Sequence, residues 1–226
     1  MSPDASSSFS PIIVEHDAKN LLAKAGIKVP RGIETREFPN KVELAFPVVL
    51  KVSDPHILHK TDVGGVKLNL SKTELRREFM AMKKKFPDSS FLIEEMQPQG
   101  IEFIIGVVKD ATFGYVIMLG TGGIYTELYH DVTFRKIPIN LADAGEMIND
   151  IRSGIFCEGF RGIQINCTAL KSTMLSISNM IVEGKHDILS MDLNPVIVTK
   201  EDAVVADAKI SVKPEGVSHL DPRSDK

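Results

Sequence analysis

The stretch PVVLKVSDPHILHKTDVGGV, residues 47–66, joins a buried strand to a loop equipped for phosphate chemistry. Its first six residues are apolar except Lys51, a pattern that predicts a buried strand with a single charge. Because burying an unpaired charge is costly, we expect Lys51 to meet an anion. The following loop supplies an imidazole, a cation, a carboxylate and two small residues: His59, Lys60, Asp62, Gly64 and Gly65. The stretch therefore predicts a site that handles a phosphoryl group.

Apolar periodicity outlines the remaining elements. Helices are expected at residues 12–25, 71–86, 141–151 and 168–183, with at best a short one at 40–45. Strands are expected at residues 47–52, 66–70, 91–93, 101–108, 114–119, 187–193 and 203–212. Because the strands come mostly in pairs with helices between the pairs, the order favours an α+β fold with largely antiparallel sheets in two subdomains. A doubly wound parallel sheet is disfavoured.

Composition narrows the class of protein. The 226 residues are 43% hydrophobic and 25% charged, with a net charge of −3, and the pI is near 6.1. These values argue against nucleic acid or an anionic membrane surface as the main partner. No apolar stretch approaches the roughly 18 residues of a membrane span. Cys157 and Cys167 could pair, but without a secretory signal we expect free buried thiols in a cytoplasmic protein.

A second polar group lies near the C-terminus. Asp192 and Asn194 are two residues apart on an extended segment, so their side chains share a face, and Asp207 on a neighbouring strand could join them. Such hard oxygen ligands suit Mg²⁺, which takes one or two carboxylates together with substrate phosphates. The alternative is a simple turn, because Asp, Asn and Pro are turn residues.

Three weaker signals have ordinary alternatives. Glu94, Glu95 and Met96 close a strand and Glu102 lies on the next one, where they could bind an adenine edge and ribose, although solvated glutamates are commoner. The loop Gly120–Gly123 could hold phosphate or be only a turn. His59 could attack a phosphoryl group, since a histidine of ordinary pKa is largely uncharged near neutral pH, or be a surface residue. Zinc is disfavoured because no cysteine or carboxylate cluster has ligand spacing.

Taken together, these residues resemble the ATP-grasp β subunit of ADP-forming acetyl-CoA synthetase. The resemblance runs from about residue 12 to residue 212. It is carried by six pieces of sequence: residues 46–51, 59–66, Ile105-Gly106 with Phe113-Gly114, Gly120–Ile124, Arg161-Gly162 and Asp192–Pro195. It implies an ATP-grasp fold with nucleotide between two α+β subdomains, residues 12–95 with the His59 loop and residues 96–212. Residues 1–11 are expected to be a disordered tail and residues 213–226 a flexible one.

The resemblance also implies roles. Lys51 would contact nucleotide phosphates, with Lys60, Gly64, Gly65, Gly122 and Gly123 around them. Glu94, Glu95 and Met96 would form the adenine hinge, and Glu102 would bind the ribose. Asp192, Asn194 and Asp207 would form the Mg²⁺ and phosphate-side group. His59 would be a phosphorylated histidine on a mobile loop, passing a phosphoryl group between a CoA-binding α subunit and ADP or ATP.

Several features depart from the family pattern. The segment between Ile33 and Phe46 is shorter than the usual helix-bearing stretch, and Thr121 replaces a usually apolar residue. Gln164 and Asn166 stand where proline and aspartate are common. The resemblance assigns no role to Glu127, Arg135 or Arg161.

The expected protein is the nucleotide-binding half of an acid–CoA ligase (ADP-forming), active only with its α subunit, in an α2β2 assembly. One alternative is a succinyl-CoA synthetase-type β chain, against which His59 argues. The other is a non-catalytic nucleotide-sensing domain of an acetyltransferase assembly.

Overall fold

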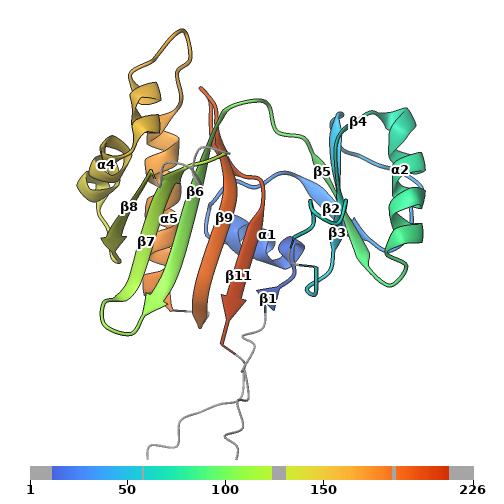
Figure 1. The fold of residues 1–226 in the computed structure, drawn as a ribbon, viewed down its shortest axis with the longest axis horizontal. Helices are drawn as coiled ribbons and strands as arrows, with labels where there is room; N and C mark the ends of the chain where they lie inside the picture. Colours follow the sequence, from blue (N-terminus) through green and yellow to red (C-terminus); the bar gives the residue numbers. More distant parts are fainter. Residues whose placement is uncertain (1–11, 58, 124–130, 185–186, 214–226) are drawn as a thin grey trace, which may run out of the picture.

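A computed structural model describes residues 12–57, 59–123, 131–184 and 187–213 (Figure 1). The tails predicted at residues 1–11 and 213–226 fall outside this range, except for Lys213, as do Leu58, Ile124 and Glu127.

The described chain forms two lobes, each built on one antiparallel sheet (Figure 1). The small sheet has the strand order β2-β5-β3-β4, and the large sheet has the order β1-β11-β9-β6-β7-β8, with β10 paired to β9. All the strand pairs in both sheets are antiparallel. The predicted α+β arrangement in two parts is therefore confirmed.

The small lobe places helix α2 against its sheet. Its elements are β2 (Gly32–Thr35), β3 (Val48–Ser53), β4 (Val66–Leu70), α2 (Lys72–Lys85) and β5 (Ser90–Glu95). The predicted capping box is present, because Ser71 accepts from the backbone of Glu74 while the Glu74 side chain accepts from Ser71. Phe79 centres the core, with its ring 5.4 Å from Phe38 and 4.9 Å from Phe91.

The short helix considered at residues 40–45 does not form. So brief a segment gains too few hydrogen bonds to offset the cost of starting a helix. Instead, its apolar side chains pack onto the small core.

The large lobe has helices on one face of its sheet (Figure 1). The strands are β1 (Ile12–Ile13), β6 (Ile101–Asp110), β7 (Gly114–Thr121), β8 (Val132–Lys136), β9 (Ile188–Val198), β10 (Ala203–Val205) and β11 (Ala208–Val212). The helices are α1 (Glu15–Lys24), α4 (Leu141–Asp150), α5 (Cys167–Glu183) and the 3-10 turn η1 (Arg152–Cys157). The single strand expected at residues 203–212 is divided between β10 and β11. At the break, Ala206 donates to the carbonyl of Pro195 and the carbonyl of Asp207 accepts from Asn194.

The first helix belongs to the large lobe. Ile12 and Ile13 pair with β11, and Ala18, Leu22 and Ile27 lie in the same core as Phe103 of β6. The sequence placed residues 12–95 together in the first subdomain, whereas β1 and α1 pack on the second sheet. The reason is that the apolar side chains of α1 pack on the large sheet. A residue near the start of the chain can therefore reach the cleft from the side of the large lobe.

The prediction of two free thiols was wrong. Cys157 ends η1 and Cys167 begins α5, which brings their Cα atoms to 5.5 Å, and the two residues form a disulfide. Separately, none of the helices in the described ranges is long and apolar enough to cross a membrane.

Candidate active site

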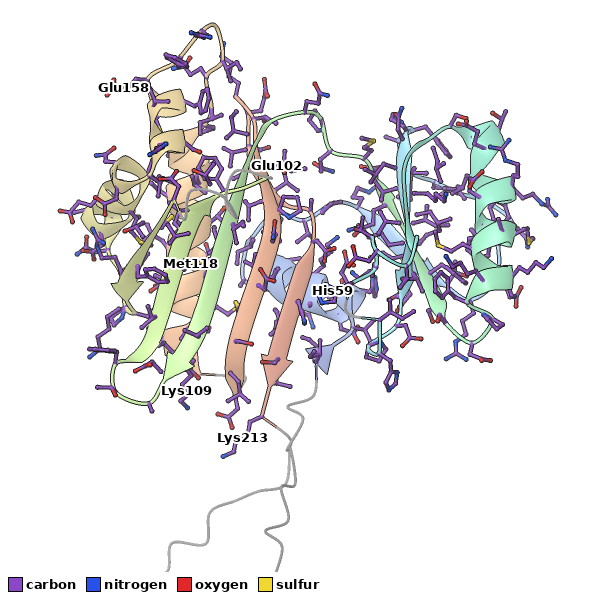
Figure 2. The ribbon with its side chains drawn as sticks, in the orientation of Figure 1. His59, Glu102, Lys109, Met118, Glu158 and Lys213 are labelled. Carbon is purple, nitrogen blue, oxygen red and sulfur yellow. A yellow bond between two sulfur atoms is a disulfide. The ribbon has the colours of Figure 1, made fainter. Side chains whose placement is uncertain are left out.

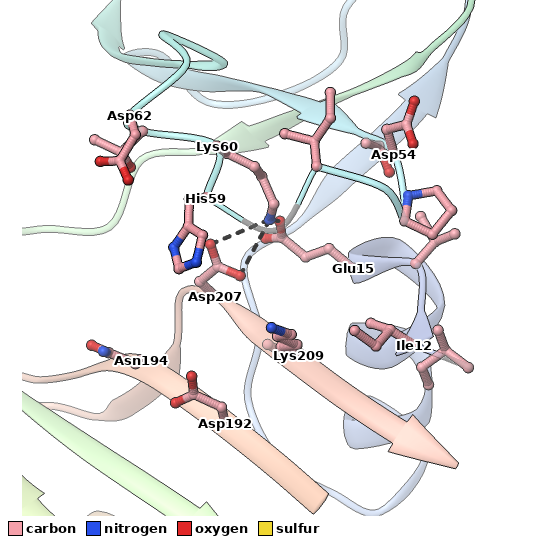
Figure 3. A pocket seen from close by; sticks show the side chains of 17 residues that line it. Ile12, Glu15, Asp54, His59, Lys60, Asp62, Asp192, Asn194, Asp207 and Lys209 are labelled. Atoms are coloured by element: carbon pink, nitrogen blue, oxygen red, sulfur yellow. Dashed lines mark hydrogen bonds and ion pairs between the residues drawn. The ribbon is translucent and has the colours of Figure 1, made fainter. Parts of the chain in front are cut away.

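Two cavities meet where the lobes face each other. The first, of about 460 Å³, lies between the loop after β3 and strands β9 and β11 (Figure 3). The second, of about 560 Å³, lies between β3, β4 and the β5–β6 connection on one side and β9 on the other. Thr61, Asn194 and Asp207 line both cavities. A ligand long enough to occupy both would therefore pass these three residues.

The first cavity gathers the predicted phosphoryl-transfer residues. His59 and Lys60 enter it from the small lobe, while Asp192, Asn194 and Asp207 enter from the large lobe (Figure 3). Figure 2 shows His59 between the two lobes. The ammonium of Lys60 lies 3.4 Å from both carboxylate oxygens of Asp207. Residues more than 130 positions apart thus line one cavity.

Asp192 has an unusual electrostatic setting in this cavity. Burial raises the pKa of its carboxyl, and the Asp207 charge adds to the rise, while Lys209 opposes it. Lys209 is its cross-strand neighbour on β11 and also lines the cavity. A carboxylate held at an unfavourable site gains stability when a cation arrives.

Much of the lining of the second cavity is apolar. Its apolar lining consists of Pro30, Val49, Val66, Leu68, Met96, Pro98, Pro195 and Ile197. The expected hinge lies here, since Glu94, Glu95, Met96 and Glu102 all line this cavity. Apolar walls with a few polar groups suit a planar base.

The hinge residues do not all face the cavity with their side chains. The Glu95 carboxylate accepts from the backbone of Ala45 at 2.9 Å and lies 3.5 Å from Arg31. Met96 donates its backbone N–H to Pro47 at 3.0 Å. The side chain of Glu95 and the backbone amide of Met96 therefore hydrogen-bond within the protein and fix the hinge. Neither group remains available for a ligand.

Between the cavities lies a buried charge cluster, which we define as Glu15, Lys19, Lys51 and Glu94. Their exposures are 6%, 3%, 6% and 2%, respectively. Lys51 lies 2.6 Å from Glu15 and 3.1 Å from Glu94, and Lys19 lies 2.8 Å and 2.6 Å from the same two residues. Both lysines also donate to the carbonyl of Ala206, at 2.7 Å and 2.8 Å. The expected anion for Lys51 is thus supplied by the protein itself.

The cluster holds its charges by mutual pairing. Burial alone would raise the pKa of Glu15, but Lys51, Lys19 and Lys60 outweigh it and hold that pKa far below its usual range. Burial alone would lower the pKa of Lys51, but Glu15, Glu94 and Asp207 raise it well above normal. Lys60 also forms an ion pair with the second oxygen of Glu15. Glu15 therefore contacts three cations from three segments.

The predicted glycines do not line either cavity. The backbone of Gly65 donates to Lys60 at 2.6 Å and accepts from Val52 at 2.8 Å, and Gly64 adopts a φ of 63°. These two residues close the His59 loop. Gly122 donates to the carbonyl of Glu102 at 2.7 Å, and a side chain on Gly122 would lie 2.6 Å from that backbone. The glycine loop thus packs against the start of β6, where Figure 2 labels Glu102.

Glu15 and Lys19 were missed by sequence reasoning. They are four residues apart on α1, a spacing that commonly marks a solvated ion pair on a helix surface. Only the packing of α1 on the large sheet brings this face of the helix to Lys51. The strongest available signal was Lys51 itself, which required a partner that the local sequence does not supply.

The donor set at the junction suits Mg²⁺. Among the described residues, no three His, Cys, Asp or Glu side chains are grouped closely enough to hold a metal by themselves. Two carboxylates and an amide line the first cavity through Asp192, Asp207 and Asn194. Mg²⁺ takes few protein ligands and completes its shell with water and phosphate, so this smaller set fits it.

Comparison with known proteins agrees with this geometry. A model of the ATP-grasp domain matches residues 5–212. The β subunits of acetate–CoA ligases (ADP-forming) I and II from Pyrococcus furiosus are 35% and 38% identical, over 88% and 89% of this chain and 90% and 92% of theirs. The acetate–CoA ligase (ADP-forming) II of Archaeoglobus fulgidus is 40% identical, and the match covers 89% of this chain but 30% of that longer protein.

A solved structure has the same fold over nearly the whole length. Acetyl-coenzyme A synthetase 1 of Candidatus Korarchaeum cryptofilum, in complex with coenzyme A and Ca-AMPCP, superposes with a TM-score of 0.80 at 35% identity, covering 92% of this chain and 96% of that one. The two-lobed architecture and the sequence relationship thus point to one family. The chain belongs to the ATP-grasp family, among the β subunits of ADP-forming acetate–CoA ligases.

Proposed function

We propose that this protein is the nucleotide-binding subunit of an ADP-forming acid–CoA ligase and that it transfers a phosphoryl group between His59 and ADP. One observation carries this proposal. A single cavity is lined by His59, Lys60, Asn194 and Asp207, and it shares lining residues with the second cavity, where we place the nucleotide. The β subunits from Pyrococcus furiosus support it over a succinyl-CoA synthetase-type chain or a sensing domain.

The two cavities suggest how the nucleotide lies. Its base would occupy the apolar end beside Met96, and its ribose would lie near Glu102. Its phosphates would then reach Lys51, Asn194 and Asp207, where the second cavity meets the first. The terminal phosphate would face His59. In this placement the reacting groups are brought together by binding alone, which is a large part of phosphoryl-transfer catalysis.

A terminal oxygen of ADP attacks the phosphorus of phosphorylated His59, a phosphorus–oxygen bond forms and the phosphorus–nitrogen bond breaks. The bonding electron pair returns to the imidazole nitrogen, and the ring takes up one proton as the phosphoryl group leaves. Lys60, adjacent in sequence and lining the same cavity, is placed to stabilise charge on the transferred group. The reverse reaction phosphorylates His59 from ATP.

Asn194 and Asp207, with Asp192 beside them, would hold Mg²⁺. When bound, Mg²⁺ neutralises phosphate charge and orients the phosphate oxygens. A relative supports this assignment: the Candidatus Korarchaeum cryptofilum enzyme, 36% identical to this chain, has a solved structure in complex with coenzyme A and Mg-AMPPCP.

The relatives point to a partner for this chain. The Pyrococcus furiosus relatives are β subunits, and the Candidatus Korarchaeum cryptofilum relative has a phosphohistidine segment pointing towards its nucleotide-binding site. We propose a CoA-binding α subunit as the partner and an α2β2 assembly. The same proposal places the protein in the cytoplasm, where ADP and ATP are available.

Intact-mass analysis after incubation with Mg²⁺ and ATP tests the proposal. The wild-type chain should gain one phosphoryl group that is acid-labile and alkali-stable, and His59→Ala should gain none. His56→Ala is the matched control, because His56 belongs to the same loop but pairs with Asp54 at 3.1 Å and is not part of the cavity lining. Its phosphorylation should match that of the wild type.

If the chain alone remains unmodified, the assay is repeated with the α subunit, acetyl-CoA and phosphate. Absence of phosphate on His59 in both assays, with turnover intact in His59→Ala, would exclude the relay.

A further inference from the structure

Lys19 has no role in the reaction as described so far, yet it is among the most buried charged residues, with 3% exposure. Its ammonium contacts both oxygens of Glu94, at 2.6 Å and 2.7 Å, as well as one oxygen of Glu15 at 2.8 Å and the carbonyl of Ala206 at 2.7 Å. A buried lysine with so many acceptors is held in a single position. Only the contact with Glu15 lies within α1, whereas Glu94 and Ala206 belong to other parts of the chain.

The contacts of Lys51 show why Lys19 matters. An ammonium has three N–H donors, and Lys51 faces three acceptors: Glu15 at 2.6 Å, the Ala206 carbonyl at 2.8 Å and Glu94 at 3.1 Å. To bind a nucleotide phosphate, Lys51 must release one of them. The longest of these three contacts is that with Glu94, and Glu94 keeps both contacts with Lys19 when Lys51 turns away.

The charge count leads to the same conclusion. The buried charge cluster contains two carboxylates, Glu15 and Glu94, and two ammonium groups, Lys19 and Lys51. Its formal charge is zero. Without Lys19, Lys51 alone would face the two carboxylates, and the cluster would carry one net negative charge. That charge would lie at the wall of the cavity that is to receive the nucleotide phosphates. In a buried setting such a charge acts strongly on its neighbours.

We propose that Lys19 is a positioning residue for nucleotide binding: it neutralises Glu94, so that Lys51 can exchange its contact with Glu94 for a phosphate oxygen. This inference rests on the proposed function, which makes the second cavity a nucleotide site. Lys19 also holds the Ala206 carbonyl next to Asp207, so the same ammonium fixes the backbone on the proposed Mg²⁺ side. Lys19 itself does not touch the nucleotide.

The test compares ligands with and without phosphate. The dissociation constants of ADP with Mg²⁺ and of adenosine are measured by calorimetry for the full chain and for Lys19→Met. We expect ADP to bind at least about tenfold more weakly, while adenosine stays within about twofold, because the apolar end of the cavity is unchanged. Equal weakening of both ligands, or no weakening of ADP, would overturn the proposal.

Restoring the charge balance provides the second arm. In the double variant Lys19→Met with Glu94→Gln, the cluster is again neutral, and ADP affinity should return to within about threefold of the wild type. Glu94→Gln alone leaves an extra positive charge near the phosphates and should bind ADP more tightly. This single variant keeps the test decisive even if Lys19→Met does not fold. Weaker ADP binding by Glu94→Gln would contradict the charge-balance argument.

The two proposals fail in different ways. If the wild-type chain binds neither ADP nor adenosine, the proposed function is wrong. If it binds ADP and becomes phosphorylated on His59 while the Lys19 variants behave like the wild type, only the role of Lys19 is wrong.

Discussion

The two cavities differ in chemistry although they share three residues. The first is lined by His59, Lys60, Asp192 and other polar groups, whereas much of the second consists of apolar side chains and backbone. A molecule with one apolar end and one charged end fits across both. The difference suggests that binding affinity and chemistry are divided between them, with recognition in the second cavity and group transfer in the first.

The wall between the cavities is as distinctive as either of them. There each ammonium of the buried charge cluster pairs with both carboxylates, Glu15 and Glu94. Such a cluster costs free energy to desolvate, which its mutual pairing offsets. Here it lies beside both the apolar base region and the polar transfer region.

Replacing His59 should separate the two cavities most sharply. In His59→Ala, turnover with the α subunit should fall by at least roughly a thousandfold, because the group that carries the phosphoryl is gone. ADP affinity should stay within about twofold, since His59 lines only the first cavity. Steady-state turnover and calorimetry measure the two quantities. A parallel loss of ADP binding would show that the cavities do not divide the work in this way.

Replacing Lys51 should affect the wall itself. Lys51→Ala leaves Glu15 and Glu94 short of one partner, and breaking a buried pair costs about 3–5 kcal/mol of stability. ADP affinity should fall as well, because Lys51 lines the second cavity near the shared residues. Thermal or denaturant unfolding and calorimetry provide the measurements.

Lys28→Ala is the matched control for this change. Lys28 also pairs with a carboxylate, Asp202 at 2.5 Å, but the two side chains are 61% and 40% exposed. An exposed pair contributes about 0–1 kcal/mol. Comparable losses in the two variants would mean that burial of the cluster is not what makes it important.

How far the sequence predicted this arrangement differs between the two cavities. His59, Lys60, Asp192, Asn194 and Asp207 could be selected because each lies in a local pattern with its own chemistry. Glu15 and Lys19 could not be selected, because their role depends on the packing of α1. The order of the elements along the chain suggested that α1 belongs to the small lobe, whereas it packs on the large sheet. The same limit explains the disulfide: ten residues separate Cys157 from Cys167, and only the η1–α5 geometry brings them together.

The fold was easier to predict than the details of the site. Period-two and helical patterns gave most elements, because each lobe buries one face of a sheet. The segment predicted as the hinge lines the second cavity, yet the side chain of Glu94 turns into the buried charge cluster. Backbone direction at the end of a strand can be inferred from periodicity, whereas the partner of an inward carboxylate depends on the tertiary structure.

Changing the junction should have a smaller effect than removing Lys51. In Asp207→Asn, the carboxylate shared by both cavities loses its charge, and the gain in ADP affinity on adding Mg²⁺ should shrink by roughly tenfold or more. Calorimetric titrations with Mg²⁺ and with a chelator measure that gain. Asp202→Asn, which changes an exposed carboxylate outside both linings, should retain it in full. An unchanged Mg²⁺ effect in Asp207→Asn would remove Asp207 from the metal site.

Lowering the pH should gradually destabilise the buried charge cluster between the cavities. The three cations around Glu15 hold its pKa below the ordinary value of 4.5, so the unfolded chain binds the proton more readily than the folded one. The stability that Glu15 contributes is therefore complete above pH 4.5 and is lost as the pH falls further. This one group adds at most about 1.4 kcal/mol per pH unit to the slope.

Unfolding midpoints measured from pH 6 downward through the ordinary glutamate pKa of 4.5 check this contribution. Glu15→Gln should show a shallower decline than the wild type, since its amide does not titrate. The other acidic residues contribute equally to the loss of stability in both proteins, so their contribution cancels in the difference. Identical slopes would mean that the Glu15 carboxylate is not held by Lys19, Lys51 and Lys60 in solution, and the buried wall would then not be the rigid divider that separates the two cavities.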